Sequence, residues 1–190
     1  MNSEKVTVVS GLPRSGTSMM MKMIEAGGIP AVTDNIRTAD EDNPRGYYEL
    51  EKVKELKNDG SWMPEAKGKV IKVISALLQD LPKDHDYRVV FMQRTMQEIL
   101  ASQKQMLVRR GQPTDRVPDE KMAAMFEKHL EKIREWLAAQ PNMEVLYIKY
   151  NDILASPAES VARLNAFFDN ALDADAMQTV VDNQLYRQRR

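Results

Sequence analysis

A β-branched run, Val6–Val9, breaks into a turn rich in glycine, proline and serine at residues 10–16 and continues as a helical pattern from Thr17. In such a strand–turn–helix segment, the backbone N–H groups of the turn and the positive end of the helix point at one spot. That spot stabilises anionic oxygens, so the segment predicts a phosphate cradle. A nucleotide is the ligand that this arrangement favours.

The two glycines of the turn, Gly11 and Gly16, have the spacing of an ATP- or GTP-binding P-loop. Thr17 stands where that motif has a lysine, and the cation lies inside the turn instead, at Arg14. The missing lysine is the side chain that reaches the β- and γ-phosphates of a nucleoside triphosphate. The sequence therefore indicates a nucleotide site that is poorly equipped to transfer a phosphoryl group.

A second candidate phosphate contact follows residues 87–92, which have the pattern of a buried strand. Arg94 stands at the carboxyl end of that strand, and Thr95 with Glu98 matches a capping box that opens a helix. Ser102 follows Thr95 by seven residues, and seven steps of about 100° return nearly to the starting side of a helix. We therefore expect Arg94 and Ser102 to address one region.

Strand and helix patterns alternate along the chain, which predicts an α/β fold with a parallel central sheet flanked by helices. Neither a repeat nor a linker is found, so we expect a single domain over residues 1–190. The methionines that follow Thr17 at helical spacing are expected in the core. Strands are predicted at residues 5–10, 29–32, 69–74, 87–92 and 144–149, and helices at 17–26, 95–110, 119–140, 157–168 and from 173.

The composition argues against several classes of partner. With 27 basic and 28 acidic side chains, the chain has no overall field that would attract nucleic acid or a membrane surface. It has no cysteine and two histidines, so we expect neither disulfides nor a metal site. No long apolar stretch or targeting leader stands at the start, which predicts a cytoplasmic protein. The basic groups are therefore expected to act locally, on a bound ligand.

The turn at residues 13–18, Pro-Arg-Ser-Gly-Thr-Ser, resembles the loop with which sulfotransferases hold the 5′-phosphosulfate of PAPS (3′-phosphoadenosine-5′-phosphosulfate). Arg94 and Ser102 are similar, in spacing and placement, to the pair with which this family grips the 3′-phosphate. The resemblance implies the P-loop-like sulfotransferase fold, with PAPS as co-substrate. The residues that it implies for the PAPS phosphates are Pro13, Arg14, Ser15, Gly16, Thr17, Ser18, Arg94 and Ser102.

Two further segments resemble the same family. Residues 145–154 are similar to a strand that ends in Tyr-Glu-Asp-Leu and whose tyrosine lies beside the adenine, which makes Tyr150 a candidate base contact. Residues 69–74 are similar to a strand whose lysine supports the transferring sulfuryl group, and Lys72 matches that lysine. Each has an ordinary alternative, in which Tyr150 only caps a strand and packs against a helix, and Lys72 is an exposed strand lysine.

The general base is the part of the family pattern that this sequence lacks. Cytosolic members have a histidine two residues after the matching lysine, and Ile74 stands there. Other members use a carboxylate, and Glu49, beside two tyrosines that would desolvate it, is the first candidate, with Asp42 the second. The alternative is that this acidic segment is a solvated loop. His85, at the opposite edge of the sheet, and His129, within an amphipathic helix, are expected to be structural.

The resemblance implies that the sulfuryl group of PAPS passes in line to a hydroxyl or amine of a small-molecule or carbohydrate acceptor. Arg14 and the turn amides would then stabilise charge on the departing 5′-phosphate. Residues 110–118 are a candidate lid or an ordinary connection, and Arg187 and Arg189 form a candidate phosphate contact or a solvated basic tail. Two other functions stay open: a small-molecule kinase that uses ATP and magnesium, and a non-catalytic nucleotide-binding module.

Overall fold

The structure is a computed structural model that describes residues 4–34, 36, 46–114 and 116–181. Strands, α-helices and three short 3-10 helices follow one another along these residues. In chain order they are β1 (Val6–Gly11), α1 (Thr17–Ala26), η1 (Glu51–Glu55), η2 (Met63–Ala66), β2 (Val70–Lys72), η3 (Ser75–Asp80), β3 (Tyr87–Gln93), α2 (Met96–Arg109), α3 (Asp119–Ala138), β4 (Met143–Lys149), α4 (Tyr150–Ala155), α5 (Pro157–Phe167) and α6 (Ala174–Thr179).

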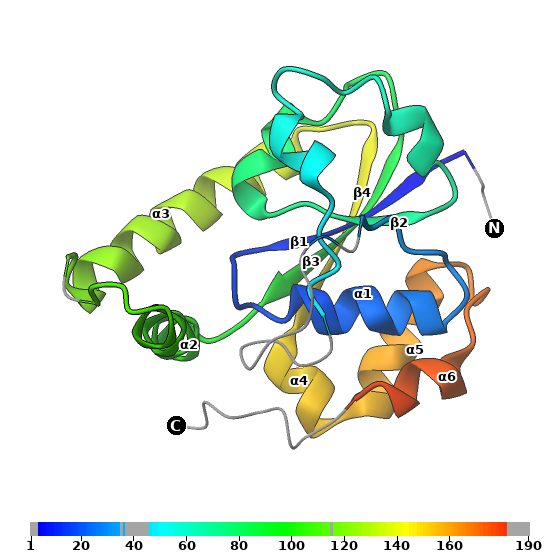
Figure 1. Cartoon of the computed structure of the whole chain (residues 1–190). Helices are drawn as coiled ribbons and strands as arrows, with labels where there is room; N and C mark the ends of the chain where they lie inside the picture. Colours follow the sequence, from blue (N-terminus) through cyan, green and yellow to red (C-terminus); the bar gives the residue numbers. More distant parts are fainter. Residues whose placement is uncertain (1–3, 35, 37–45, 115, 182–190) are drawn as a thin grey trace.

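The strands form one parallel sheet in the order β2-β1-β3-β4 (Figure 1), which confirms the predicted α/β fold. β1 lies inside the sheet and is buried along its whole length, as its β-branched sequence predicts. Val8 pairs with Val89 of β3, and Val9 pairs with Val90. Because the strands are parallel, their carboxyl ends meet at one edge, and the β1–α1 turn follows β1 at that edge.

Helices cover both faces of the sheet and enclose a separate apolar core on each (Figure 1). Under one face, the buried methionines of α1 pack with Val9 and with α4, α5 and α6, so these methionines are core residues, as predicted. Over the other face, η1–η3 and α3 pack on Val6 and Val8, and α3 contributes Ile133 and Leu137. No helix in the described part of the chain is long and apolar enough to cross a membrane.

The strand predicted at residues 29–32 is wrong. Only Ala31 pairs, in an isolated bridge to Val70 at the outer side of β2. The Pro30 carbonyl accepts from the Val70 N–H at 2.9 Å, and the Val32 N–H donates to the Val70 carbonyl at 2.9 Å. Pro30 has no N–H of its own, so the ladder cannot continue through it.

The predicted capping box marks the right helix start but does not form. Thr95 directly precedes α2, yet its hydroxyl accepts no hydrogen bond from that helix. The Glu98 carboxylate accepts instead from the Arg94 Nε at 2.8 Å. A charge-assisted contact of this kind is stronger than a neutral cap. This explains why Glu98 pairs with Arg94 and does not complete the predicted capping box.

An ion cluster holds the amino-terminal edge of the sheet. Arg88 Nε donates to Glu144 at 3.2 Å and Arg88 Nη2 to Asp169 at 2.7 Å, and Lys5 also bonds Glu144. The Lys5 ammonium, with Arg88, holds the pKa of Glu144 below its usual range, and Arg88 does the same for Asp169. The contacts that stabilise this edge therefore lie at the far end of the strands from the candidate phosphate residues.

Candidate functional site

The turn between β1 and α1 has the backbone of an anion cradle. Arg14 and Gly16 have left-handed backbones, with φ of 72° and 96°, and the Ser15 N–H donates to the Leu12 carbonyl at 3.2 Å. Ser15 is 1% exposed, and its Oγ has no hydrogen-bond partner among the described residues. The first N–H groups of α1 have no carbonyl partner within the helix, so an anion in the turn would satisfy them.

Gly16 lies directly against Tyr150, the first residue of α4. A Cβ atom on Gly16 would stand 2.4 Å from Tyr150 Cδ2, which no side chain tolerates. The tyrosine is 7% exposed, and burial raises the pKa of its phenol while the nearby Arg94 charge opposes that rise. Tyr150 thus supports the turn in this structure, and its contact with a nucleotide base stays a prediction.

We expect Gly16→Ala to lower the free energy of unfolding by about 1–3 kcal/mol more than Gly28→Ala does. Both glycines have positive φ, but a Cβ atom on Gly28 meets nothing within 4 Å. The difference therefore isolates the clash with Tyr150 from the backbone strain. Urea unfolding measures both variants, and equal losses of stability would show that the tyrosine moves aside at no cost.

Arg94 follows β3 at the carboxyl edge, as predicted, and its side chain turns back to the cradle. Its Nη1 donates to the Arg14 carbonyl at 3.0 Å, and its Cζ lies 4.4 Å from the centroid of the Tyr150 ring. A guanidinium over an aromatic face at this distance is a favourable cation–π contact. Arg94 therefore ties the β3–α2 junction to the backbone of the turn.

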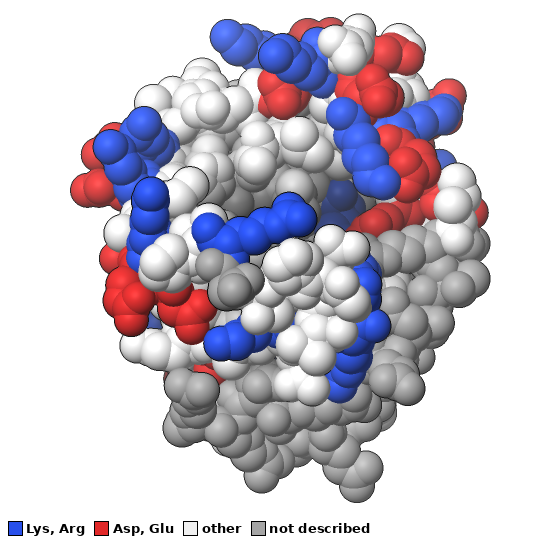
Figure 2. Space-filling view, turned by 60° about the vertical axis from the view of Figure 1, so that its left-hand side comes forward, with Lys and Arg blue, Asp and Glu red and all other residues white. Residues whose placement is uncertain are grey.

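Ser102 completes this connection from α2. It is buried, and its Oγ accepts a hydrogen bond from the Arg14 Nε at 2.9 Å. The three side chains that the sequence assigned to two phosphates, Arg14, Arg94 and Ser102, are thus brought together. Figure 2 turns the side that bears α2 and α3 toward the viewer and shows Lys and Arg side chains around and inside a hollow.

Lys72 ends β2 and pairs in register with Val9 of β1. Its side chain is 8% exposed, so the alternative of an exposed strand lysine is wrong. Its Nζ donates to the Tyr47 carbonyl at 2.8 Å and to Ser18 Oγ at 3.2 Å. A buried ammonium is therefore held beside the first turn of α1, at the same edge as the cradle.

Glu49 lies near this ammonium, with its Oε1 3.9 Å from Lys72 Nζ and its side chain 27% exposed. The structure therefore brings together two of the residues predicted for the transfer step, from segments far apart in sequence. The second candidate base, Asp42, lies outside the described residues, as do Arg187 and Arg189.

The histidines have contacts of their own. His129 Nε2 lies 2.9 Å from the buried Ser75 Oγ, and burial lowers the pKa of this imidazole. His85 Nδ1 lies 2.9 Å from the Asp84 carboxylate, just before β3 begins. Both placements are those that the sequence predicted.

Sequence reasoning missed two residues beside Arg94. Glu98 is 4% exposed, and its Oε1 accepts from the Asn151 Nδ2 at 2.9 Å while its Oε2 accepts from Arg94. Arg94 and Glu98 stand four residues apart at the start of α2, and this spacing of opposite charges was a signal for the pair. Nothing local indicated Asn151, which comes from the start of α4.

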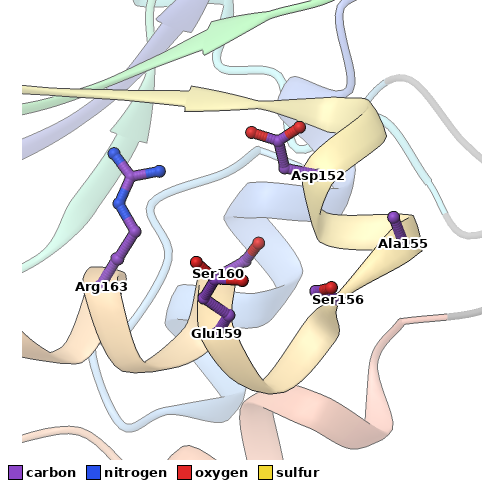
Figure 3. Close-up of a pocket in the computed structure, with 6 residues that line it drawn as sticks. All are labelled: Asp152, Ala155, Ser156, Glu159, Ser160 and Arg163. Carbon is purple, nitrogen blue, oxygen red and sulfur yellow. The ribbon is translucent and has the colours of Figure 1, made fainter.

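A pocket between α4 and α5 is a different feature of the surface (Figure 3). It contains none of the candidate residues, and the carboxylates of Asp152 and Glu159 line it. Arg163 extends from α5 toward β4, where its Nη2 donates to the Tyr147 carbonyl at 3.3 Å. Two carboxylates against one guanidinium give the lining a net negative charge, which disfavours an anionic ligand such as a nucleotide.

The chain was compared with known proteins. A family model described as a sulfotransferase domain matches residues 4–190, and no curated protein matches the sequence. Solved structures share the fold at low identity. Retinol dehydratase, in complex with androsterone and the inactive cofactor PAP, superposes with a TM-score of 0.52 at 17% identity, over 95% of this chain and 64% of that one. This chain thus spans less than two thirds of the length of retinol dehydratase.

Two bacterial proteins give similar values. Sulfotransferase STF9 from Mycobacterium avium superposes with a TM-score of 0.54 at 14% identity, over 94% of this chain and 68% of that one. A sulfotransferase from Alicyclobacillus acidocaldarius has a TM-score of 0.52 at 12% identity, over 95% of this chain and 87% of that one. At these identities the likeness concerns the fold.

Proposed function

The chain belongs to the sulfotransferase domain family, and we propose that it transfers a sulfuryl group from PAPS to a hydroxyl or amine of a small-molecule or carbohydrate acceptor. The observation that supports this most is the convergence of Arg14, Arg94 and Ser102 at the turn between β1 and α1. One relative of the same fold, retinol dehydratase, was crystallised with PAP. PAP is the nucleotide that remains when PAPS loses its sulfuryl group.

In this proposal the turn at residues 13–18 binds the 5′-phosphosulfate through its N–H groups and hydroxyls. Arg94 and Ser102 bind the 3′-phosphate, which gives PAPS an advantage over ATP. ATP has no 3′-phosphate and would leave these two buried side chains without their ligand. The preference for PAPS is therefore assigned to a pair of side chains outside the turn.

The transfer itself needs a base, a stabilised sulfuryl group and a stabilised leaving group. The acceptor oxygen or nitrogen attacks sulfur, the bond between sulfur and the 5′-phosphate oxygen breaks, and the acceptor proton passes to Glu49. Lys72, 3.9 Å from that carboxylate, supports the sulfuryl oxygens. Arg14 and the N–H groups of the turn stabilise the charge that grows on the departing phosphate.

Binding and turnover together test this proposal against the kinase and the non-catalytic module. We expect adenosine 3′,5′-bisphosphate to bind at least about tenfold more tightly than ADP with magnesium in calorimetry, because a hydrogen-bonded charged group contributes this much. Labelled sulfate should then pass from PAPS to a member of an acceptor panel. Tighter binding of ADP would favour the kinase, and bisphosphate binding without turnover would favour the module.

A further inference from the structure

We propose that Glu98 and Asn151 are positioning residues that hold Arg94 in the orientation in which it binds a ribose 3′-phosphate. The inference rests on the proposed function, since it assigns the 3′-phosphate to Arg94. It adds a buried carboxylate and an amide that touch no ligand themselves and act through the arginine.

Three contacts restrain the Arg94 guanidinium. Its Nε donates to Glu98 at 2.8 Å, its Nη1 donates to the Arg14 carbonyl at 3.0 Å, and its face lies 4.4 Å from the centre of the Tyr150 ring. The donors of a guanidinium have a fixed planar geometry. Two bonds in the plane and one ring beneath it therefore set the direction of every N–H of this side chain.

Asn151 restrains Glu98 in turn. Its Nδ2 donates to Glu98 Oε1 at 2.9 Å, so each carboxylate oxygen of Glu98 has a different partner. Asn151 follows Tyr150 at the start of α4, so one element supplies both the amide that holds Glu98 and the ring that lies against Arg94. The two helix starts, of α2 and α4, are joined through Arg94.

The burial of this ion pair indicates a role beyond stability. The side chains of Arg94 and Glu98 are 8% and 5% exposed. Removing two charges from water costs about as much as their attraction returns, so a buried pair is weak evidence for stabilisation. An apolar pair of the same size could stabilise the fold as well as this ion pair does, but it could not orient an arginine toward an anion.

The ratio of two affinities tests the inference: that for adenosine 3′,5′-bisphosphate over that for adenosine 5′-monophosphate, both by calorimetry. Glu98→Ala should lower this ratio about tenfold, because Arg94 loses its Nε partner, and Asn151→Ala about threefold. The double variant should match Glu98→Ala alone, because Asn151 acts through Glu98. A purely structural role would weaken both nucleotides alike and leave the ratio unchanged.

Glu144→Ala is the matched control, because it removes one carboxylate partner of another buried arginine, Arg88, at the opposite edge of the sheet. It should leave the ratio unchanged. The inference is overturned if folded Glu98→Ala keeps the wild-type ratio. If that variant does not fold, Asn151→Ala decides in the same way. A wild-type protein without any preference for the bisphosphate would instead contradict the proposed function.

Discussion

Lys72→Met should lower kcat for sulfuryl transfer by about 10²- to 10³-fold, the usual cost of losing one preorganised charge at the reacting group. The affinity for adenosine 3′,5′-bisphosphate should change by less than about twofold, because that product carries no sulfuryl group for Lys72 to contact. Methionine has nearly the shape of the lysine stem, so the buried site next to Ser18 and Tyr47 keeps most of its packing. Single-turnover transfer from labelled PAPS measures the loss.

Lys69→Met is the control for this experiment. Lys69 is exposed, directly precedes β2 and lies at the amino end of that strand, three residues from Lys72. The Lys69→Met enzyme should retain the wild-type kcat. A Lys72→Met enzyme with more than about a tenth of the wild-type rate would contradict this role, because a tenfold loss corresponds to only about 1.4 kcal/mol of transition-state stabilisation.

Arg94→Ala combined with Ser102→Ala should weaken the binding of adenosine 3′,5′-bisphosphate by roughly 10²-fold or more, since each lost bond to a charged group costs about 1.5–3 kcal/mol. Adenosine 5′-monophosphate should lose far less, because it lacks the group that these residues bind. A small loss is expected even there, since Ser102 also accepts from Arg14. Calorimetry with both nucleotides measures the two losses.

Lys104→Ala removes a positive charge from the exposed side of α2, two residues beyond Ser102, and should change neither affinity. This control separates a specific contact from a general electrostatic one. Unchanged bisphosphate affinity in the double variant would mean that neither Arg94 nor Ser102 binds the nucleotide. The turn at residues 13–18 would then be the main element of the site.

The parts of the site that local sequence encodes could be predicted. β1 begins with the β-branched run Val6–Val9 and is buried along its whole length, and Gly11 and Gly16 mark the turn that follows the run. The helical period alone predicts that Ser102 lies on the side of α2 that faces the junction with β3, where Arg94 stands. These features depend on a few neighbouring residues, so no knowledge of the rest of the chain was needed.

Contacts between distant segments could not be predicted in this way. The ring of Tyr150 lies against Gly16 because α4 starts beside the turn, and Glu49 comes near Lys72 because the segment before η1 crosses the end of β2. Glu98 shows the same limit, since its local pattern is that of a helix cap and its actual partners include Asn151 of α4. Tertiary contacts outweighed a correct local signal in that case.

Arg94 donates a hydrogen bond to the backbone of the turn, and Arg14 donates one to Ser102, so contacts within the protein itself fix both guanidinium groups. Side chains held in this way lose little conformational entropy when the proposed nucleotide binds. Association should then be a single kinetic step whose rate rises linearly with nucleotide concentration, without the plateau that a slow loop rearrangement imposes. The discrimination between nucleotides would accordingly reside in how fast each one leaves.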